Sequence, residues 1–217
     1  MNKMRLWLVW IGLSALGASA QQVMYANLKE LAEGRGDTVT TLLVEKRTRN
    51  QLLLMGGADY RIEAVNNRGM NRYLRKRCYA VRIDTALYVN CRKMRYKNFR
   101  FGNWYASAMR VGDRVYYCAQ PVGQAASSST VPDDAARLAG EVGDAIAASG
   151  LVNERVCYEL DLQTGRSSFL SRGRMMELLE DYPVLQEAFA KETGESAEVM
   201  VRYLRRLQKM LLIGKNE

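Results

Sequence analysis

Hydrophobic residues repeat with a different period in the two halves of this chain, and this change constrains the fold most. Between residues 38 and 120, β-branched and aliphatic residues form strand-length runs separated by polar or glycine-containing turns. Between residues 174 and 213, apolar residues instead recur every three or four positions, as at Met200, Leu204, Leu207 and Leu211. This order predicts an α+β protein with a β-rich N-terminal half of antiparallel hairpins and a mostly helical C-terminal half.

Turn residues divide the first half into short elements. We expect a helix over residues 27–33, strands over 38–46, 50–55 and 60–65, and one or two helical turns over 70–76. Three hairpins should follow, pairing 78–83 with 86–91, 104–109 with 114–120, and 155–162 with 167–171. A two-residue turn at Asp84-Thr85 would place Ile83 opposite Ala86, Val81 opposite Tyr88 and Cys78 opposite Cys91.

The N-terminal segment has the three parts of a secretory signal. Lys3 and Arg5 precede an apolar run over residues 6–18, and Ala18-Ser19-Ala20 forms a small-residue cleavage site. The run is shorter than the roughly 20 residues that span a bilayer, and no later segment is long and apolar enough to do so. We therefore expect cleavage after Ala20 and a periplasmic or secreted protein.

Composition divides the rest of the chain into three parts. We expect a β-rich domain over residues 21–123, an Ala- and Ser-rich linker over 124–132, and a helical region with one β-hairpin over 133–217. The helical region would begin with a helix from Asp133 to Ser149. It either forms a second domain or packs on the first part as a single domain.

Four cysteines would lie in an oxidising compartment, where disulfides persist. The hairpin register predicts a bridge between Cys78 and Cys91, and a second bridge would then join Cys118 and Cys157. None of the four has the CxxC spacing of zinc or thioredoxin sites, so we expect no metal and no cofactor.

The chain contains no histidine. This excludes Ser-His-Asp and Cys-His hydrolases, zincins and His-ligated copper sites. An enzyme would have to use carboxylates, Tyr, Lys or a Ser-Lys pair. Glu159 and Asp161 lie two apart on a predicted strand and so share a face, which would suit acid/base catalysis; alternation with apolar neighbours explains them equally as solvent-facing acids.

The positive charge is concentrated in one basic segment, residues 68–100. The formal net charge is +9, and this segment holds eleven basic residues against one acid, Asp84. Its tyrosines and phenylalanine would suit nucleic acid in a cytoplasmic protein, but export favours anionic lipid, acidic glycan or an acidic protein partner. A solvated charged face is the alternative. Extending the hairpin would oppose Arg77 to Arg92 and Lys76 to Lys93, so the strands separate there or an anion lies between them. The candidate ligand-binding residues are Lys76, Arg77, Arg92, Lys93, Arg95, Lys97 and Trp104.

Several short motifs are similar to those of a known group. They are Gly57-Ala58-Asp59-Tyr60-Arg61-Ile62, Cys78-Tyr79-Ala80-Val81-Arg82, Leu87-Tyr88-Val89-Asn90-Cys91, Gly102-Asn103-Trp104-Tyr105-Ala106, Asp181-Tyr182-Pro183 and Tyr203-Leu204. Together they resemble an uncharacterised family of exported proteins from gut Bacteroidota. The resemblance implies an envelope or secreted setting and no particular activity.

Charge, export and the missing histidine favour a non-enzymatic binding protein that recognises an anionic or glycan component of the cell envelope. One alternative is a His-independent enzyme that acts on envelope polysaccharide through a carboxylate pair. Another is an interaction module that docks on a second exported protein through its basic face or its C-terminal helices.

Overall fold

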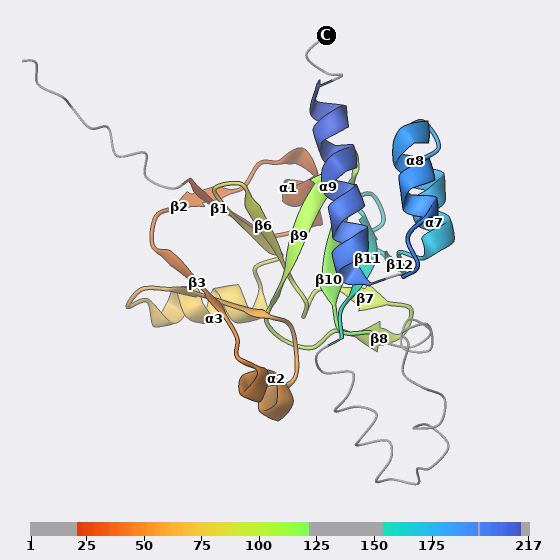
Figure 1. The fold of residues 1–217 in the computed structure, drawn as a ribbon. Coiled ribbons are helices and arrows are strands. Elements are labelled where there is room, and N and C mark those ends of the chain that lie inside the picture. Colours follow the sequence, from red (N-terminus) through yellow and green to blue (C-terminus); the bar gives the residue numbers. More distant parts are fainter. Residues whose placement is uncertain (1–20, 122–153, 195, 214–217) are drawn as a thin grey trace, which may run out of the picture.

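The computed structural model describes residues 21–121, 154–194 and 196–213. Within these residues twelve strands form one mixed sheet (Figure 1). In spatial order they are β2 (Asp37–Val39), β1 (Gln22–Tyr25), β5 (Ala80–Ile83), β6 (Ala86–Asn90), β9 (Tyr105–Val111), β10 (Arg114–Ala119), β11 (Val156–Asp161), β12 (Ser167–Phe169), β7 (Arg95–Tyr96) and β8 (Phe99–Arg100). The strands β3 (Leu42–Lys46) and β4 (Tyr60–Ala64) branch off, and Tyr60 of β4 pairs with Tyr105 of β9. Neighbouring strands are antiparallel except β12 and β7, which are parallel.

The described helices lie in both halves of the chain. The first half contains α1 (Leu28–Glu33), α2 (Arg49–Met55) and α3 (Arg68–Lys76), and the second contains α7 (Arg172–Leu178), α8 (Pro183–Ala190) and α9 (Ala197–Ile213). The expectation of a β-rich half followed by a helical half is therefore wrong. Strands β11 and β12 come from the second half, yet β11 pairs along its whole length with β10 of the first. One sheet thus crosses the boundary that composition suggested, because β10 pairs with β9 on one edge and with β11 on the other.

The predicted hairpin register is confirmed next to the Asp84-Thr85 turn, but it does not extend to Cys78 and Cys91. Ile83 lies opposite Ala86 and Val81 opposite Tyr88 across the Asp84-Thr85 turn, where Asp84 has a positive φ of 52°. Strands β9 and β10 turn at Gly112-Asp113, and β11 pairs with β12 as expected. The predicted signal peptide (1–20), linker (124–132) and helix (133–149) lie outside the described residues.

Residues 50–55 form helix α2 and not the strand that their aliphatic run suggested. The Thr48 side chain accepts a hydrogen bond from the Gln51 backbone N–H, and the Gln51 side chain accepts one from the Thr48 N–H. This capping box satisfies two N–H groups that a helix start would otherwise leave unpaired. Gly56, at φ 56°, ends the helix after Met55. A Thr-x-x-Gln start and a glycine stop thus outweigh strand propensity.

Both faces of the sheet are covered. Strand β9 shows this, because Ala106 and Ala108 pack in one core, whereas Tyr105 and Val111 on its other face pack in two others. The first core lies under α1 and the β7–β8 hairpin. On the opposite face, α3 and the β3–β4 branch cover one end of the sheet, and α7, α8 and α9 cover the other (Figure 1). No helix among residues 21–121, 154–194 and 196–213 is long and apolar enough to cross a membrane.

The four cysteines are free thiols, so neither predicted disulfide is present. Cys91 continues β6 and lies in the first core, but Cys78 lies in the core beneath α3. The Asn90 side-chain N–H donates to the carbonyl oxygens of Leu74 and Cys78, and regular pairing of β5 with β6 begins only at Ala80. Cys78 is therefore turned away from Cys91.

Cys118 and Cys157 do lie opposite each other on β10 and β11, with 3.0 Å between their Sγ atoms, but they are not bonded. Cys118 is partly exposed and Cys157 is buried.

Candidate anion-binding site

Helix α3 places three arginines of the basic segment on one face. Arg68, Arg72 and Arg75 are spaced by four and three residues, so they lie one above another. The Asn67 side chain caps the helix by accepting from the Met70 N–H at 2.9 Å. The Asn71 side chain joins α3 to β4, because its Oδ1 accepts from the Ala64 N–H and its amide donates to the Ala64 carbonyl. The arginine face is thereby held at a fixed distance from β4.

These arginines line a cavity of about 250 Å³ between α3 and β4. Its wall consists of Ile62, Glu63, Arg68, Asn71, Arg72, Arg75, Trp104 and Tyr105. Buried Ile62 and Tyr105 form an apolar base, and the Tyr105 hydroxyl donates to the Leu74 carbonyl at 2.8 Å. We call this the Trp104 pocket. It combines guanidinium donors with an aromatic ring and a firm base, the elements that hold an anionic ligand.

Trp104 adopts a backbone conformation that bulky residues rarely occupy, with φ at 76°. Two neighbouring segments hold it there. Its carbonyl accepts from the Cys91 N–H at 2.9 Å, and the preceding Asn103 carbonyl accepts from the Ala58 N–H at 2.9 Å. Gly57 makes this approach possible, because a Cβ atom there would lie 2.5 Å from the Asn103 oxygen. Strain of this kind is often retained at functional sites.

Two guanidinium groups lie against the Trp104 ring, those of Arg47 at 5.3 Å and Arg61 at 5.8 Å from its centroid. Arg47 is buried, and its side chain donates to the carbonyl oxygens of Gln51, Gly56 and Ala58. Burial lowers the pKa of Arg47, and the nearby Asp59 carboxylate partly offsets this. Arg47 therefore fixes the turn that supports Trp104.

The three α3 arginines form no ion pair with a carboxylate among the described residues. Glu63, the acid in the pocket wall, is bound to Arg61 at 2.7 Å. Glu159, Glu177 and Glu192 of the C-terminal part pair with arginines outside α3. Within the described part of the chain, no carboxylate neutralises the positive charge of α3.

The other candidate residues surround the pocket or lie away from it. Lys76 and Arg77 end α3, so the opposed like charges of an extended hairpin do not arise and the strands separate as expected. Arg92 donates to the Asn103 side chain at 3.0 Å, next to Trp104, and Lys93 follows it. Arg95 lies on β7 and Lys97 in the β7–β8 turn, at the other end of the sheet order. Sequence reasoning nominated Trp104 but not its arginine partners, which the spacing of Arg68, Arg72 and Arg75 could have indicated.

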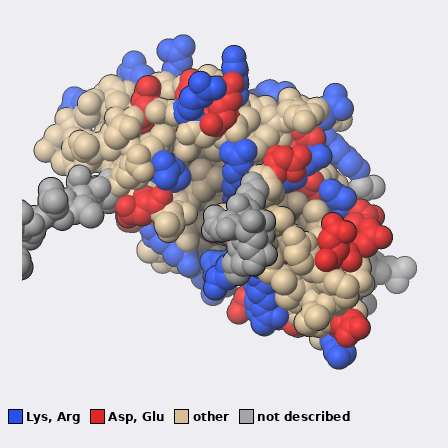
Figure 2. Space-filling view, turned by 90° about the horizontal axis from the view of Figure 1, so that it is seen from above, with Lys and Arg blue, Asp and Glu red and all other residues tan. Residues whose placement is uncertain are grey.

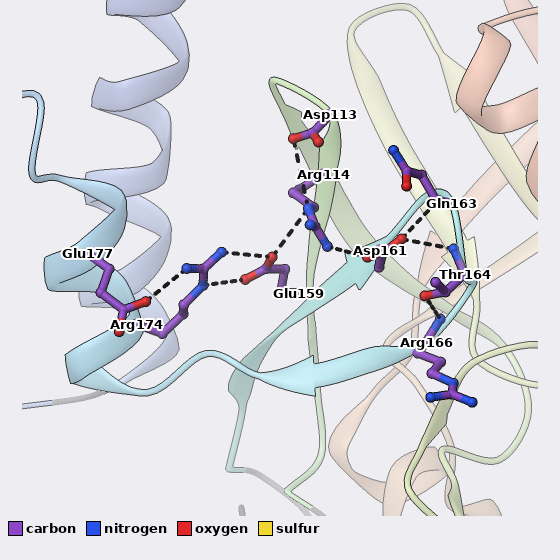
Figure 3. Close-up of polar contacts among 9 residues, drawn as sticks. All are labelled: Asp113, Arg114, Glu159, Asp161, Gln163, Thr164, Arg166, Arg174 and Glu177. Carbon is purple, nitrogen blue, oxygen red and sulfur yellow. Dashed lines mark hydrogen bonds and ion pairs between the residues drawn. The ribbon is translucent and has the colours of Figure 1, made fainter.

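Glu159 and Asp161 are held in ion pairs (Figure 3). Glu159 is 4% exposed and lies between Arg174, whose Nε is 3.1 Å away, and Arg114, whose Nε is 3.6 Å away. Asp161 accepts from Arg114 at 2.6 Å and from the backbone N–H groups of Gln163 and Thr164. Hydrogen bonds from those N–H groups and the charge of Arg114 lower the pKa of Asp161. A carboxylate held this way is a poor proton donor, and the pair connects β10, β11 and α7.

Basic and acidic side chains are interspersed over the face seen from above (Figure 2). Several Lys and Arg side chains border a hollow near the middle of this face. A groove of about 610 Å³ at the side of α9 is lined by Arg202, Arg205, Arg206 and Lys209, together with Asp59, Glu198 and Arg155. This groove contains both signs of charge, whereas the Trp104 pocket contains one acid that is already paired.

The fold and the pocket define an α+β protein with a large mixed sheet and a cationic, Trp-containing cavity on one face. The chain belongs to the family of unknown function DUF6563, whose model matches residues 23–211. The resemblance to an uncharacterised family is thereby confirmed, while the bacterial group and export stay predictions. We find no match to a curated protein or to a solved structure.

Proposed function

We propose that this protein is an exported, non-enzymatic binding protein whose Trp104 pocket takes an anionic group of a cell-envelope component. The observation that carries the proposal is that Arg68, Arg72 and Arg75 share one cavity with Trp104 and have no ion-pair partner among the described residues. A guanidinium group binds a phosphate or carboxylate with two parallel hydrogen bonds, and three such groups on one helix face suit a group with several oxygens.

The strain at Trp104 supports a functional reading of the pocket. A positive φ costs on the order of 1–3 kcal/mol for a residue with a side chain. Here the cost is met by two backbone hydrogen bonds and by the buried Arg47. Tyr105 and Ile62, which also line the pocket, are buried without a positive φ. Packing around the pocket therefore does not by itself require the strained backbone of Trp104.

The enzyme alternative receives less support from the same residues. Its candidate acids, Glu159 and Asp161, are bound by Arg174, Arg114 and backbone N–H groups. A general acid needs a raised pKa, and that of Asp161 is lowered.

The test compares two variants that each lose three positive charges. One replaces Arg68, Arg72 and Arg75 with Gln, and the matched control replaces Lys29, Arg95 and Arg100 with Gln. All six side chains are exposed, but only the first three line the pocket. Binding to immobilised polygalacturonate and to phosphatidylglycerol vesicles is measured at several salt concentrations, with dextran and phosphatidylcholine as neutral references.

We expect the pocket variant to bind the anionic ligand about tenfold or more weakly, and the control to stay within about threefold of the unmodified protein. Binding should also weaken as salt rises, because exposed charges are screened over about 8 Å at physiological ionic strength. Equal losses in both variants would mean that net charge binds and the pocket does not. Failure of the unmodified protein to bind either anionic ligand at low salt would refute the proposal.

A further inference from the structure

Helix α2 ends in three consecutive exposed apolar residues. Leu53, Leu54 and Met55 are 44%, 86% and 65% exposed, whereas Leu52, which precedes them, is buried. In Figure 1 the helix projects away from the sheet at the bottom of the view. We call these three residues the α2 tip. Apolar side chains that gather at a projecting end commonly mark a contact with a partner or a membrane.

Hydrogen bonds at both ends of α2 hold the tip in place. The Arg47 side chain donates to the Gln51 carbonyl within α2 and to the Gly56 carbonyl directly after it. The capping box fixes the start of the same helix. These hydrogen bonds fix both ends of α2. The fold therefore keeps the three apolar side chains on the surface.

A short segment connects the tip to the contact with Trp104, and basic side chains flank the start of α2. Gly57 lies two residues after Met55 and packs against Asn103. A Cβ atom added at Gly57 would lie 3.1 Å from the Trp104 ring. Lys46 and Arg49, which flank the helix start, are exposed and form no ion pair among the described residues. An apolar projection with basic side chains behind it matches a bilayer with anionic headgroups, since the apolar part enters the acyl boundary while the charges meet phosphates.

We propose that the α2 tip inserts into an anionic lipid surface, so that the ligand of the Trp104 pocket is a phosphate-bearing lipid headgroup. This inference rests on the proposed function and narrows it to one ligand class. A second copy of the chain fits the tip less well, because joining two tips would bring Lys46 and Arg49 of each copy toward like charges.

The test separates the tip from the pocket. The tip variant replaces Leu53, Leu54 and Met55 with Ser, and the matched control replaces Val184 and Leu212 with Ser; these are exposed by 81% and 59% on α8 and α9. Co-sedimentation with phosphatidylglycerol and phosphatidylcholine vesicles reports membrane binding. Binding to soluble inositol hexakisphosphate reports the pocket, and thermal melting reports folding.

We expect the tip variant to lose vesicle affinity on the order of 100-fold, because each buried CH₂ group adds to membrane affinity. Its inositol hexakisphosphate binding and melting temperature should match those of the unmodified protein, and the α8–α9 control should bind vesicles normally. Unchanged vesicle binding by the tip variant would overturn the inference while leaving the proposed function intact. A lowered melting temperature with normal vesicle binding would show that the tip is covered by protein. If the unmodified protein binds polygalacturonate but neither vesicles nor inositol hexakisphosphate, the inference fails and the proposed function stands. If it binds none of the three, both proposals fail.

Discussion

At the scale of single residues, the site depends on a contact between two loops. Gly57 has φ at 81°, and its Cα faces the Asn103 carbonyl that precedes Trp104. The sequence indicated a break at Gly56-Gly57 but could not show what the glycine faces, because Asn103 is distant along the chain. The same limit applied to Cys78 and Cys91. The turn gave the correct register only as far as Ala80 opposite Val89. Beyond it, the Asn90 side chain donates to the Cys78 carbonyl, and Cys78 lies in another core.

Replacing Gly57 with Ala should therefore destabilise the protein by about 2 kcal/mol, through backbone strain and the clash with the Asn103 oxygen. Ligand binding in the Trp104 pocket should weaken as well. Gly112 is the matched control, since it has φ at 60° but no atom within 4 Å of an added Cβ. Gly112→Ala should cost about 1 kcal/mol and leave binding unchanged. Urea unfolding measures both, and equal costs would show that the loop contact is not tight.

At the scale of elements, the hairpins were predicted and the helix α2 was missed. Hairpin registers follow from local turns, and the three expected pairings are present. The run Leu52-Leu53-Leu54-Met55 gave no period that distinguishes a short strand from a short helix. The Thr48 capping box decides between them, and it was visible in the sequence. The sequence indicated Trp104 as a candidate by residue type. It could not indicate the pocket, because the pocket forms only where α3 lies beside β4.

The Glu159 ion pairs should stabilise the contact of β10 and β11 with α7. Changing Glu159 to Gln keeps its shape but removes the charge that faces Arg114 and Arg174, so we expect a loss of about 2 kcal/mol or more. Glu177 also binds Arg174 but is 65% exposed, and Glu177→Gln should cost under about 0.5 kcal/mol. Urea titration distinguishes the two variants. Similar small costs would mean that the buried carboxylate contributes little.

At the scale of the whole molecule, the strand order was beyond sequence reasoning. Strand β7 follows β6 in the chain, yet it lies at the far end of the sheet beside β12. No local pattern specifies a partner that far away, and a single residue pair, Ser167 with Tyr96, joins the two strands. The core beneath supplies the cause. The Tyr96 and Phe101 rings pack against Tyr158 of β11, with centroids 5.6 and 4.6 Å from its ring. This aromatic packing keeps β7 and β8 beside β12.

Buried acidic groups in these cores predict a loss of stability in alkali. Burial raises the pKa of Cys78 to about 11, of Cys91 to about 12 and of Tyr79 to about 12, from 9.0 for the thiols and 10.0 for the phenol. The folded state therefore keeps protons that the unfolded state releases. The stability from these groups is complete below pH 9 and is lost as pH rises toward 12.

Urea unfolding at a series of pH values tests this. The free energy of unfolding should fall steadily above pH 9, and Cys91→Ala should reduce the slope, because it removes one of the shifted thiols. A flat profile up to pH 11 would contradict the burial of these groups.

The pairing of β10 with β11 also governs the order in which the fold can be completed. A ribosome releases residues 21–121 well before Val156–Asp161, so a nascent chain would hold β10 with one edge open and without the Tyr158 and Leu160 side chains of its main core. An open edge invites wrong partners until the missing strand arrives. Native assembly must therefore wait for the second half of the polypeptide, and a holding factor that delays collapse during synthesis would raise the yield of folded protein.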